Sequence, residues 1–310
     1  MNDAAVVDHS NSKKRAVVLG GGGPVGVAWE LGLAAGLASG GIDLADADLI
    51  VGTSAGSIAG AMLAGGDDPA QLSSDIESIF QNSAGSSGAT EVSQSGLAGF
   101  MEMIFDSGQL AADPVAAAAH LNKIGQYALD ASTIAEEAFV NALASVFAGR
   151  EWPEGFVCTA IDTANGEFQP WDSSSNVALE RAIASSCSVP GVYPPITING
   201  RRFMDGGARS GLNADLASGY DTVVVVSVTL LELPPGLEDE RIGSYLAKER
   251  AVVEALNASG SKVELIVPDM EFLMISGMGL NLMDFTAIVA SAEAGQKLGK
   301  AEAERIAAIW

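Results

Sequence analysis

Apolar residues occur along this chain as short strand-like runs that alternate with longer helical stripes. Buried strands are predicted at 15–20, where Ala-Val-Val-Leu leads into glycines, and at 48–52. Between them, residues 24–39 are apolar nearly all round, as in a helix buried against a sheet, and a second such helix extends from Ser54 to Ala64. This alternation of strand and helix predicts a mainly parallel sheet with helices on both faces.

The pattern changes in the second half of the chain. Two Asn-Gly pairs, at 165–166 and 199–200, each join two short apolar runs, which is a strong signal for a β-hairpin. The β-branched run at 222–229 and the run at 262–267 predict further strands, and an apolar stripe places a closing helix at 285–306.

The stretch between these halves carries no strand pattern. Residues 82–95 are rich in Ser and Gly and predict a loop, and Asp113-Pro114 suits the start of a helix that follows. We therefore expect one α/β domain at 15–310, with a helical insertion near 82–150 and a flexible N-terminal tail at 1–14.

Composition excludes some classes of function. Of the 310 residues, 48% are hydrophobic, which excludes disorder for most of the chain. The 39 acidic residues outnumber the 16 basic ones, and the formal charge of -23 argues against nucleic acid as a partner. The same charge opposes binding to anionic membranes, so we expect any membrane contact to be apolar and transient.

Targeting and metal-binding signals are weak. No run of about 18 uninterrupted apolar residues occurs, and residues 1–14 do not resemble a secretory signal. Cys158 and Cys187 are too few for a disulfide scaffold and lack the spacing of metal ligands. We expect a cytoplasmic protein, and the composition leaves open peripheral contact with a membrane and the oligomeric state.

A glycine run follows the first strand. Gly21 to Gly26 match G-x-G-x-x-G, the dinucleotide-binding fingerprint, but the acidic residues near the expected distance precede the second strand instead of ending it. A Walker A site is excluded because no Lys-Ser/Thr pair follows the glycines. Backbone N–H groups of such a loop can instead stabilise a developing negative charge, as an oxyanion hole. A tight turn without a chemical role is the plain alternative.

Ser54 lies in Gly52-Thr53-Ser54-Ala55-Gly56, directly after the second predicted strand. G-x-S-x-G at such a place is typical of a nucleophilic serine on a sharp strand-to-helix turn. An ordinary helix N-cap is the alternative interpretation. Ligands of parallel sheets gather at the carboxyl ends of the strands, so we expect Ser54 and the glycine run at the same edge.

A nucleophilic serine needs a base within hydrogen-bond reach. His9 belongs to the polar tail, and we expect His120 to be a partly exposed helix residue, so neither suits a hydrolase triad in which histidine comes last. Asp205, in Asp205-Gly206-Gly207, is the candidate base, although an Asp-Gly pair alone is also a common turn. The sequence thus predicts that Ser54 and Asp205 form a catalytic pair.

Taken together, the motifs resemble those of the patatin-like phospholipase family, in its bacterial form. Order and spacing agree over residues 15–210, in the segments Gly20–Gly26, Gly52–Gly56, Ala184–Pro195, which is similar to an Ala-Ser…Pro…Phe-Pro-Pro segment, and Asp205–Gly207. The resemblance implies a three-layer α/β/α sandwich and hydrolysis of acyl esters by Ser54 and Asp205, without cofactor or metal. It also implies oxyanion donors and supporting motif residues, namely Gly21, Gly22 and Gly23, and Gly26, Gly52, Gly56, Gly206 and Gly207.

One departure from the family pattern concerns the substrate. Members often carry Arg or Lys where this chain has Val25, so a neutral ester or a lysolipid is as suitable here as a diacyl phospholipid. We expect a serine acyl hydrolase of lipid carboxylic esters, of the phospholipid or lysophospholipid class. A general carboxylesterase on small esters and a non-catalytic nucleotide-binding protein using Gly21–Gly26 are the alternatives. The Met-rich residues 272–280 suit either an acyl groove or ordinary core packing.

Overall fold

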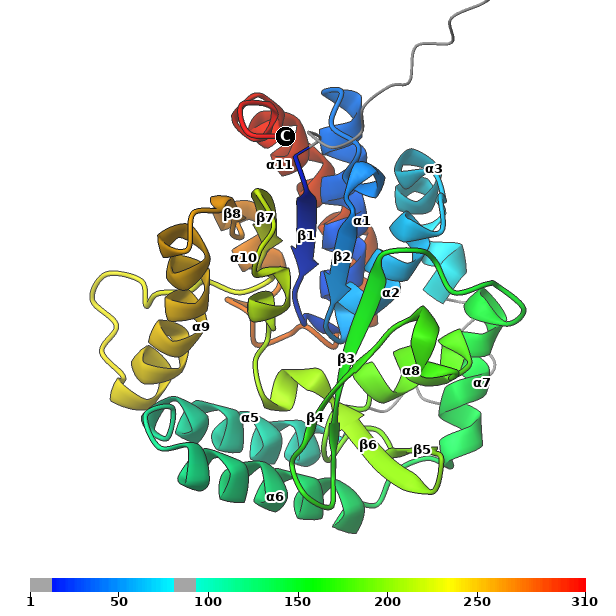
Figure 1. The fold of residues 1–310 in the computed structure, drawn as a ribbon, viewed down its shortest axis with the longest axis vertical. Coiled ribbons are helices and arrows are strands. Elements are labelled where there is room, and N and C mark those ends of the chain that lie inside the picture. The colour runs from blue at the N-terminus through cyan, green and yellow to red at the C-terminus, as the bar shows by residue number, and fades with distance from the viewer. Residues whose placement is uncertain (1–12, 81–92) are drawn as a thin grey trace, which may run out of the picture.

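The computed structural model describes residues 13–80 and 93–310. These residues form an eight-stranded sheet in the spatial order β5-β6-β3-β2-β1-β7-β8, with β4 paired to β3 outside this path (Figure 1). The strands are β1 Arg15–Leu19, β2 Leu49–Gly52, β3 Phe156–Asp162, β4 Phe168–Trp171, β5 Ile196–Ile198, β6 Arg201–Asp205, β7 Thr222–Val226 and β8 Lys262–Ile266.

The sheet changes from parallel to antiparallel along β3. Residues 156–158 of β3 pair in parallel with β2, whereas residues 160–162 pair antiparallel with β6. Both predicted Asn-Gly hairpins are present, as β3–β4 and β5–β6. Because β6 runs back toward β2, its last residue, Asp205, lies opposite Ala160, just beyond the level at which β2 ends.

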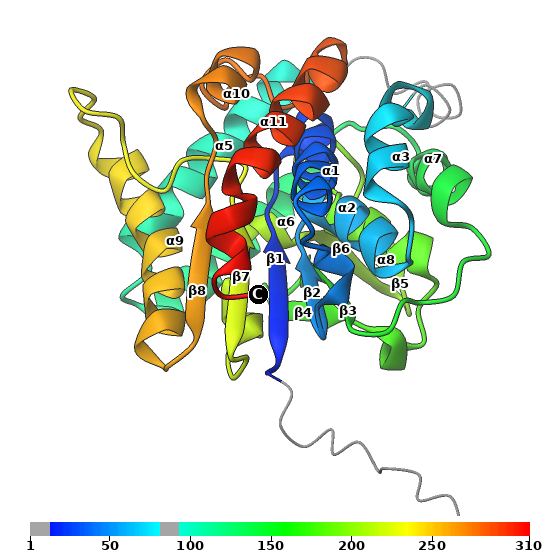
Figure 2. The same ribbon diagram turned by 90° about the horizontal axis from the view of Figure 1, so that it is seen from above.

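Helices cover both faces of the sheet, with α1, α2 and α11 on one face and α5, α6 and α9 on the other (Figures 1 and 2). Successive residues of β1 enter separate cores on the two faces, because strand side chains alternate with a period of two. The fold is therefore the expected three-layer α/β/α sandwich. The helices are α1 Gly23–Ser39, α2 Ala55–Ala64, α3 Pro69–Ser74, α5 Gln94–Gln109, α6 Pro114–Asp130, α7 Glu136–Phe147, α8 Leu179–Ser186, α9 Glu240–Ala258, α10 Met270–Ile275 and α11 Ile288–Ala307.

The helical insertion consists of α5, α6 and α7. Asp113 caps α6 as predicted, by accepting hydrogen bonds from two backbone N–H groups of the first turn. The prediction of a loop up to residue 95 is wrong at its end, because Ser93 caps α5 through the Gly96 N–H and the helix begins at Gln94. Residues 82–92 of that loop and residues 1–12 of the predicted tail lie outside the described residues.

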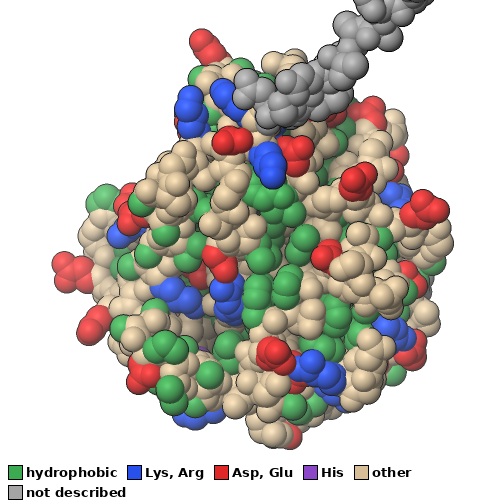
Figure 3. All heavy atoms as spheres, in the orientation of Figure 1, with side chains coloured by type: hydrophobic (Ala, Val, Ile, Leu, Met, Phe, Trp, Pro, Cys, Tyr) green, Lys and Arg blue, Asp and Glu red, His purple; other side chains and the backbone are tan. Residues whose placement is uncertain are grey.

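On the face drawn in Figure 3, acidic and basic side chains are scattered around the rim, and hydrophobic side chains gather near the middle. Of the helices at 13–80 and 93–310, none combines the length and the apolar composition needed to cross a bilayer.

Candidate active site

Three segments meet where β1, β2 and β6 end. The glycine run follows β1, Ser54 follows β2, and Asp205 is the last residue of β6. The Ser54 side chain lies close enough to the Asp205 carboxyl group to lower its pKa as a hydrogen-bonding partner. The structure thus brings together the two residues predicted to form the catalytic pair.

Ser54 has an unusual backbone conformation. Its φ of 53° and ψ of -114° are rarely adopted by a residue with a side chain, and a conformation of this kind costs on the order of 1–3 kcal/mol. Ser54 is the N-cap residue of α2 by position, but its side chain makes no capping hydrogen bond, so capping does not account for its hydroxyl. The turn is sharp because α2 packs closely on β1: a Cβ on Gly56 would lie 2.1 Å from the Leu19 carbonyl oxygen. Ser54 therefore occupies a sharp strand-to-helix elbow, as the G-x-S-x-G pattern predicts.

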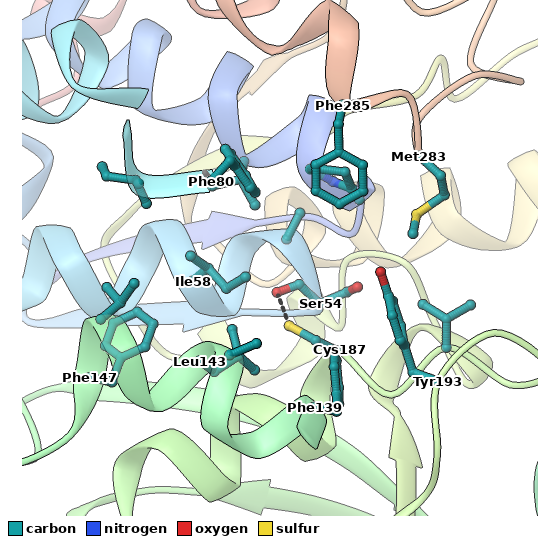
Figure 4. Close-up of a pocket in the computed structure, with 18 of the residues that line it drawn as sticks. Ser54, Ile58, Phe80, Phe139, Leu143, Phe147, Cys187, Tyr193, Met283 and Phe285 are labelled. Atoms are coloured by element: carbon teal, nitrogen blue, oxygen red, sulfur yellow. Dashed lines mark hydrogen bonds between the residues drawn. The ribbon is translucent and has the colours of Figure 1, made fainter. Parts of the chain in front are cut away.

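The backbone of Ser54 is held by three neighbouring side chains. The Ser186 Oγ accepts a hydrogen bond from the Ser54 N–H at 3.0 Å. The Ser54 carbonyl oxygen accepts bonds from the Ser57 Oγ at 2.6 Å and from the Cys187 Sγ at 3.2 Å (Figure 4). Ser186 and Cys187 were part of a recognised motif, but their contact with Ser54 depends on tertiary packing and left no signal in the sequence.

Asp205 is 3% exposed. Burial raises its pKa from the ordinary 3.8 to about 7, against the lowering effects of hydrogen bonds from the Ser54 side chain and the Gly207 N–H. The Gly207 bond to Oδ1 measures 2.7 Å. A carboxyl with a pKa near neutrality is suited to take up and return a proton.

Within the described residues, the first two N–H groups of the glycine run are hydrogen-bonded and the last two are not. The Gly20 and Gly21 N–H groups donate to the carbonyls of Val226, at 3.1 Å, and Gly211, at 2.9 Å. In the described part of the chain, the N–H groups of Gly22 and Gly23 have no acceptor. Gly23 has a φ of 58°, which glycine adopts without strain. The assignment of Gly21 as an oxyanion donor is therefore revised, because its N–H is already engaged.

A buried polar network lies behind this site. The Asn213 Nδ2 donates to the Thr53 Oγ1 at 3.0 Å, and Thr53 in turn contacts the Thr159 hydroxyl at 2.9 Å. The Ser210 Oγ donates to Glu249 Oε2 of α9 at 2.6 Å. This network ties the segment between Asp205 and Asn213 to α9 and thereby positions the Gly211 carbonyl that holds Gly21.

An apolar pocket opens beside Ser54 (Figure 4). Ile58 and Met62 line it from α2, and Phe139, Leu143 and Phe147 line it from α7. Hydrogen-bonding side chains in its lining, within the described residues, are those of Ser54, Cys187 and Tyr193. A hydrocarbon chain is the ligand that such walls favour.

The Met-rich segment does not form this pocket. Phe272 is buried and stacks on Trp29, with ring centroids 4.9 Å apart, as core packing predicts. Met274, Met278 and Leu280 are instead exposed and do not line the pocket. Met283 and Phe285, which come after this segment in the chain, do line the pocket.

The remaining candidates supply no side chain that hydrogen-bonds to Ser54 or Asp205 in the described part of the chain. His120 is buried, not partly exposed as expected, because its Nε2 bonds to the Met103 carbonyl of α5 at 2.7 Å. The motif glycines Gly26, Gly52 and Gly206 pack closely against neighbouring residues around the elbow and the two loops. No group of three or more His, Cys, Asp or Glu side chains at 13–80 and 93–310 could hold a metal ion.

Comparisons with known proteins give a family assignment. Residues 17–218 match the family model described as Patatin-like phospholipase. Two solved structures are similar at 14% identity: VipD from Legionella pneumophila, with a TM-score of 0.38 over 74% of this chain and 51% of that one, and the type III effector protein ExoU, with a TM-score of 0.31 over 81% and 54%. This chain spans about half the length of either protein. A search of curated proteins found no match. Since the family model covers well over half of its residues, the chain belongs to the patatin-like phospholipase family.

Proposed function

We propose that this protein is a serine hydrolase of lipid carboxylic esters, in which Ser54 is the nucleophile and Asp205 the general base. One observation supports this proposal above the others. The Ser54 side chain lies on a strained elbow, lines an apolar pocket, and is a hydrogen-bonding neighbour of a buried carboxyl whose pKa is about 7. That combination satisfies the two needs of a serine nucleophile, a base and an orientation.

In the proposed reaction, ionised Asp205 accepts the Ser54 proton while the Ser54 Oγ attacks the ester carbonyl carbon. The N–H groups of Gly22 and Gly23 stabilise the oxyanion that forms, assisted by the N-terminus of α1. Protonated Asp205 then donates to the leaving alcohol as the tetrahedral intermediate collapses to an acyl-enzyme. Water, deprotonated by Asp205, attacks this ester and releases the fatty acid, which restores both residues.

The pocket supports a lipid over a small ester as the substrate. Ser54, Ile58 and Met62 follow one face of α2, and eight residues of helix span about 12 Å. With C–C bonds of about 1.5 Å, an extended chain of roughly ten carbons has this length. An acetyl group would leave most of these apolar walls unfilled. Among the described residues, the lining contains no charged side chain to bind a nucleotide phosphate or ribose, so the nucleotide-binding alternative gains no support.

The test uses p-nitrophenyl esters, lysophospholipid and a fluorophosphonate probe. Ser54→Ala should abolish turnover of every ester and all probe labelling. Ser291→Ala is the matched control, because Ser291 is a buried serine of α11 outside the pocket, and its hydroxyl bonds to the Ala287 carbonyl. Turnover by Ser54→Ala near the wild-type rate, or labelling at another residue, would refute the proposal.

We also propose that a lipid surface contacts the exposed apolar lip formed by Met270, Met274, Met278 and Leu280. These side chains are 46–77% exposed, and the same segment continues to Leu282, whose carbonyl accepts a bond from the Val25 N–H beside the glycine run. The lip therefore adjoins the site where an acyl chain would enter. The net charge of -23 favours a neutral, zwitterionic surface over an anionic one.

Vesicle sedimentation tests this contact. Met274→Ser with Leu280→Ser should weaken binding to phosphatidylcholine vesicles, whereas Val115→Ser, an equally exposed apolar residue on α6, should not. Hydrolysis of a soluble short-chain ester should stay unchanged in both. Equal binding by the two variants would contradict a role for the lip.

A further inference from the structure

Tyr193 is the pocket residue whose polar group has no assigned partner. Its ring stacks on Phe139 of α7, with centroids 4.3 Å apart and planes 12° from parallel. Within the described part of the chain, its hydroxyl has no hydrogen-bond partner, whereas the hydroxyl of Tyr127 donates to the Gly96 carbonyl at 2.8 Å. A phenol placed in an apolar pocket without a partner is unfavourable unless a ligand or water supplies one.

The backbone around Tyr193 and the plane of its ring are held by neighbouring groups. Tyr193 precedes two prolines, its N–H donates to the Val189 carbonyl at 2.9 Å, and the Ser188 Oγ donates to the Pro194 carbonyl at 2.5 Å. The stack on Phe139 fixes the plane of the ring. A hydroxyl held in this way is preorganised, which is what a hydrogen-bond donor to a reacting group requires.

The Tyr193 hydroxyl lies in the same pocket as Ser54. Figure 4 shows the Tyr193 ring upright in the pocket, with its oxygen at the end of the ring that lies beside the Ser54 side chain in this view. Both residues line the same pocket, and Cys187, which bonds to the Ser54 carbonyl, is close enough to Tyr193 to affect its ionisation.

We propose that the Tyr193 hydroxyl donates a hydrogen bond to an oxygen of the reacting ester, and that Tyr193 is therefore a third catalytic residue beside Ser54 and Asp205. The inference rests on the proposed function, because it needs an ester at Ser54. Tyr193 keeps its proton throughout, since burial raises the pKa of its phenol to about 12. The bond strengthens as negative charge develops on the ester oxygen, so it lowers the barrier more than it tightens substrate binding.

Tyr193→Phe tests the proposal, because it removes one oxygen and keeps the stacked ring. We expect kcat to fall about 10- to 100-fold, with KM changed little and the thermal midpoint unchanged. Tyr220→Phe, at a tyrosine outside the pocket, should retain wild-type kcat. A p-nitrophenyl ester and an alkyl ester of the same acid identify the oxygen: equal losses indicate the carbonyl oxygen, and a greater loss with the alkyl ester indicates the leaving oxygen.

Failure of this inference can be told apart from failure of the proposed function. If Ser54→Ala is inactive while Tyr193→Phe retains wild-type kcat with both esters, or changes KM alone, Tyr193 is not catalytic and the hydrolase proposal stands. Active Ser54→Ala overturns both. Tyr193→Phe should still be labelled by the fluorophosphonate probe, since the nucleophile and its base remain in place.

Discussion

Replacing Asp205 by Asn should abolish hydrolysis and, at neutral pH, stabilise the fold. Asparagine has almost the same shape, and its carbonyl oxygen can still accept the 2.7 Å bond from the Gly207 N–H. It cannot ionise, so it cannot take the Ser54 proton. It also avoids the burial of a negative charge, which is what the pKa of Asp205 reports.

The size of the effect follows from that pKa. Asp205 titrates at about 7 in the folded protein against an ordinary 3.8, and about 3 units at 1.36 kcal/mol each correspond to about 4 kcal/mol. Because the folded-state pKa is raised, folding favours the protonated form, and wild-type stability falls as the pH rises from about 4 to about 7. The Asn variant lacks this loss. Its advantage should be absent near pH 4 and should reach about 4 kcal/mol above pH 8.

Denaturant unfolding at several pH values measures this difference, and activity is measured on the same samples. Asp46→Asn, at an exposed carboxyl, is the control and should show no advantage that grows with pH. Wild-type kcat/KM should rise about tenfold per unit below pH 7 and level off above it, because the base must be ionised. A stability difference that is independent of pH, or that favours wild type above pH 8, would refute the assignment of Asp205 as a buried base with a raised pKa.

Three further predictions concern the walls of the site. Gly22→Ala should lower kcat about 10²-fold in steady-state assays. The added Cβ would lie 2.5 Å from the Val228 Cγ1, and relief of this clash would displace the proposed oxyanion donor. Val228→Ala in the same chain should therefore restore part of the loss. Leu143→Trp should fill the pocket and shift the ratio of palmitate to butyrate ester hydrolysis toward butyrate, and an unchanged ratio would place the acyl chain elsewhere. Ser210→Ala should lower the free energy of unfolding by about 1–3 kcal/mol, because buried Glu249 loses its 2.6 Å donor, and denaturant unfolding measures this.

The sequence was sufficient for the elements whose own pattern is strong. β1 and α1 are buried on every side, so their apolar runs have few alternatives, and the Asn-Gly pairs determine two hairpins locally. Helix α9 had no such signal, because buried Glu249 and largely buried Lys248 interrupt its apolar stripe. Both side chains find hydrogen-bond partners about 40 residues earlier in the chain: Glu249 accepts from Ser210, and Lys248 donates to the Arg209 carbonyl.

The site was predictable to a similar extent. Ser54 and Asp205 could be paired because each stands in a motif and a parallel sheet brings strand ends together. The sequence could not show that the Gly21 N–H is already hydrogen-bonded, because its acceptor is the carbonyl of Gly211, 190 residues later in the chain. The pocket depends likewise on α7 lying beside α2, which no local pattern of residues 139–147 can specify.

One short segment, residues 186–193, contacts Ser54, Asp205 and the pocket. Ser186 and Cys187 hold the two backbone polar groups of Ser54, and the Ser188 carbonyl accepts a bond from the Asp205 N–H at 3.0 Å. Cys187 and Tyr193 also line the pocket. A shift of this segment therefore changes the separation of Ser54 from Asp205 together with the shape of the acyl site. If the proposed function holds, we therefore expect substitutions in this segment to change the reaction rate and the chain-length preference together.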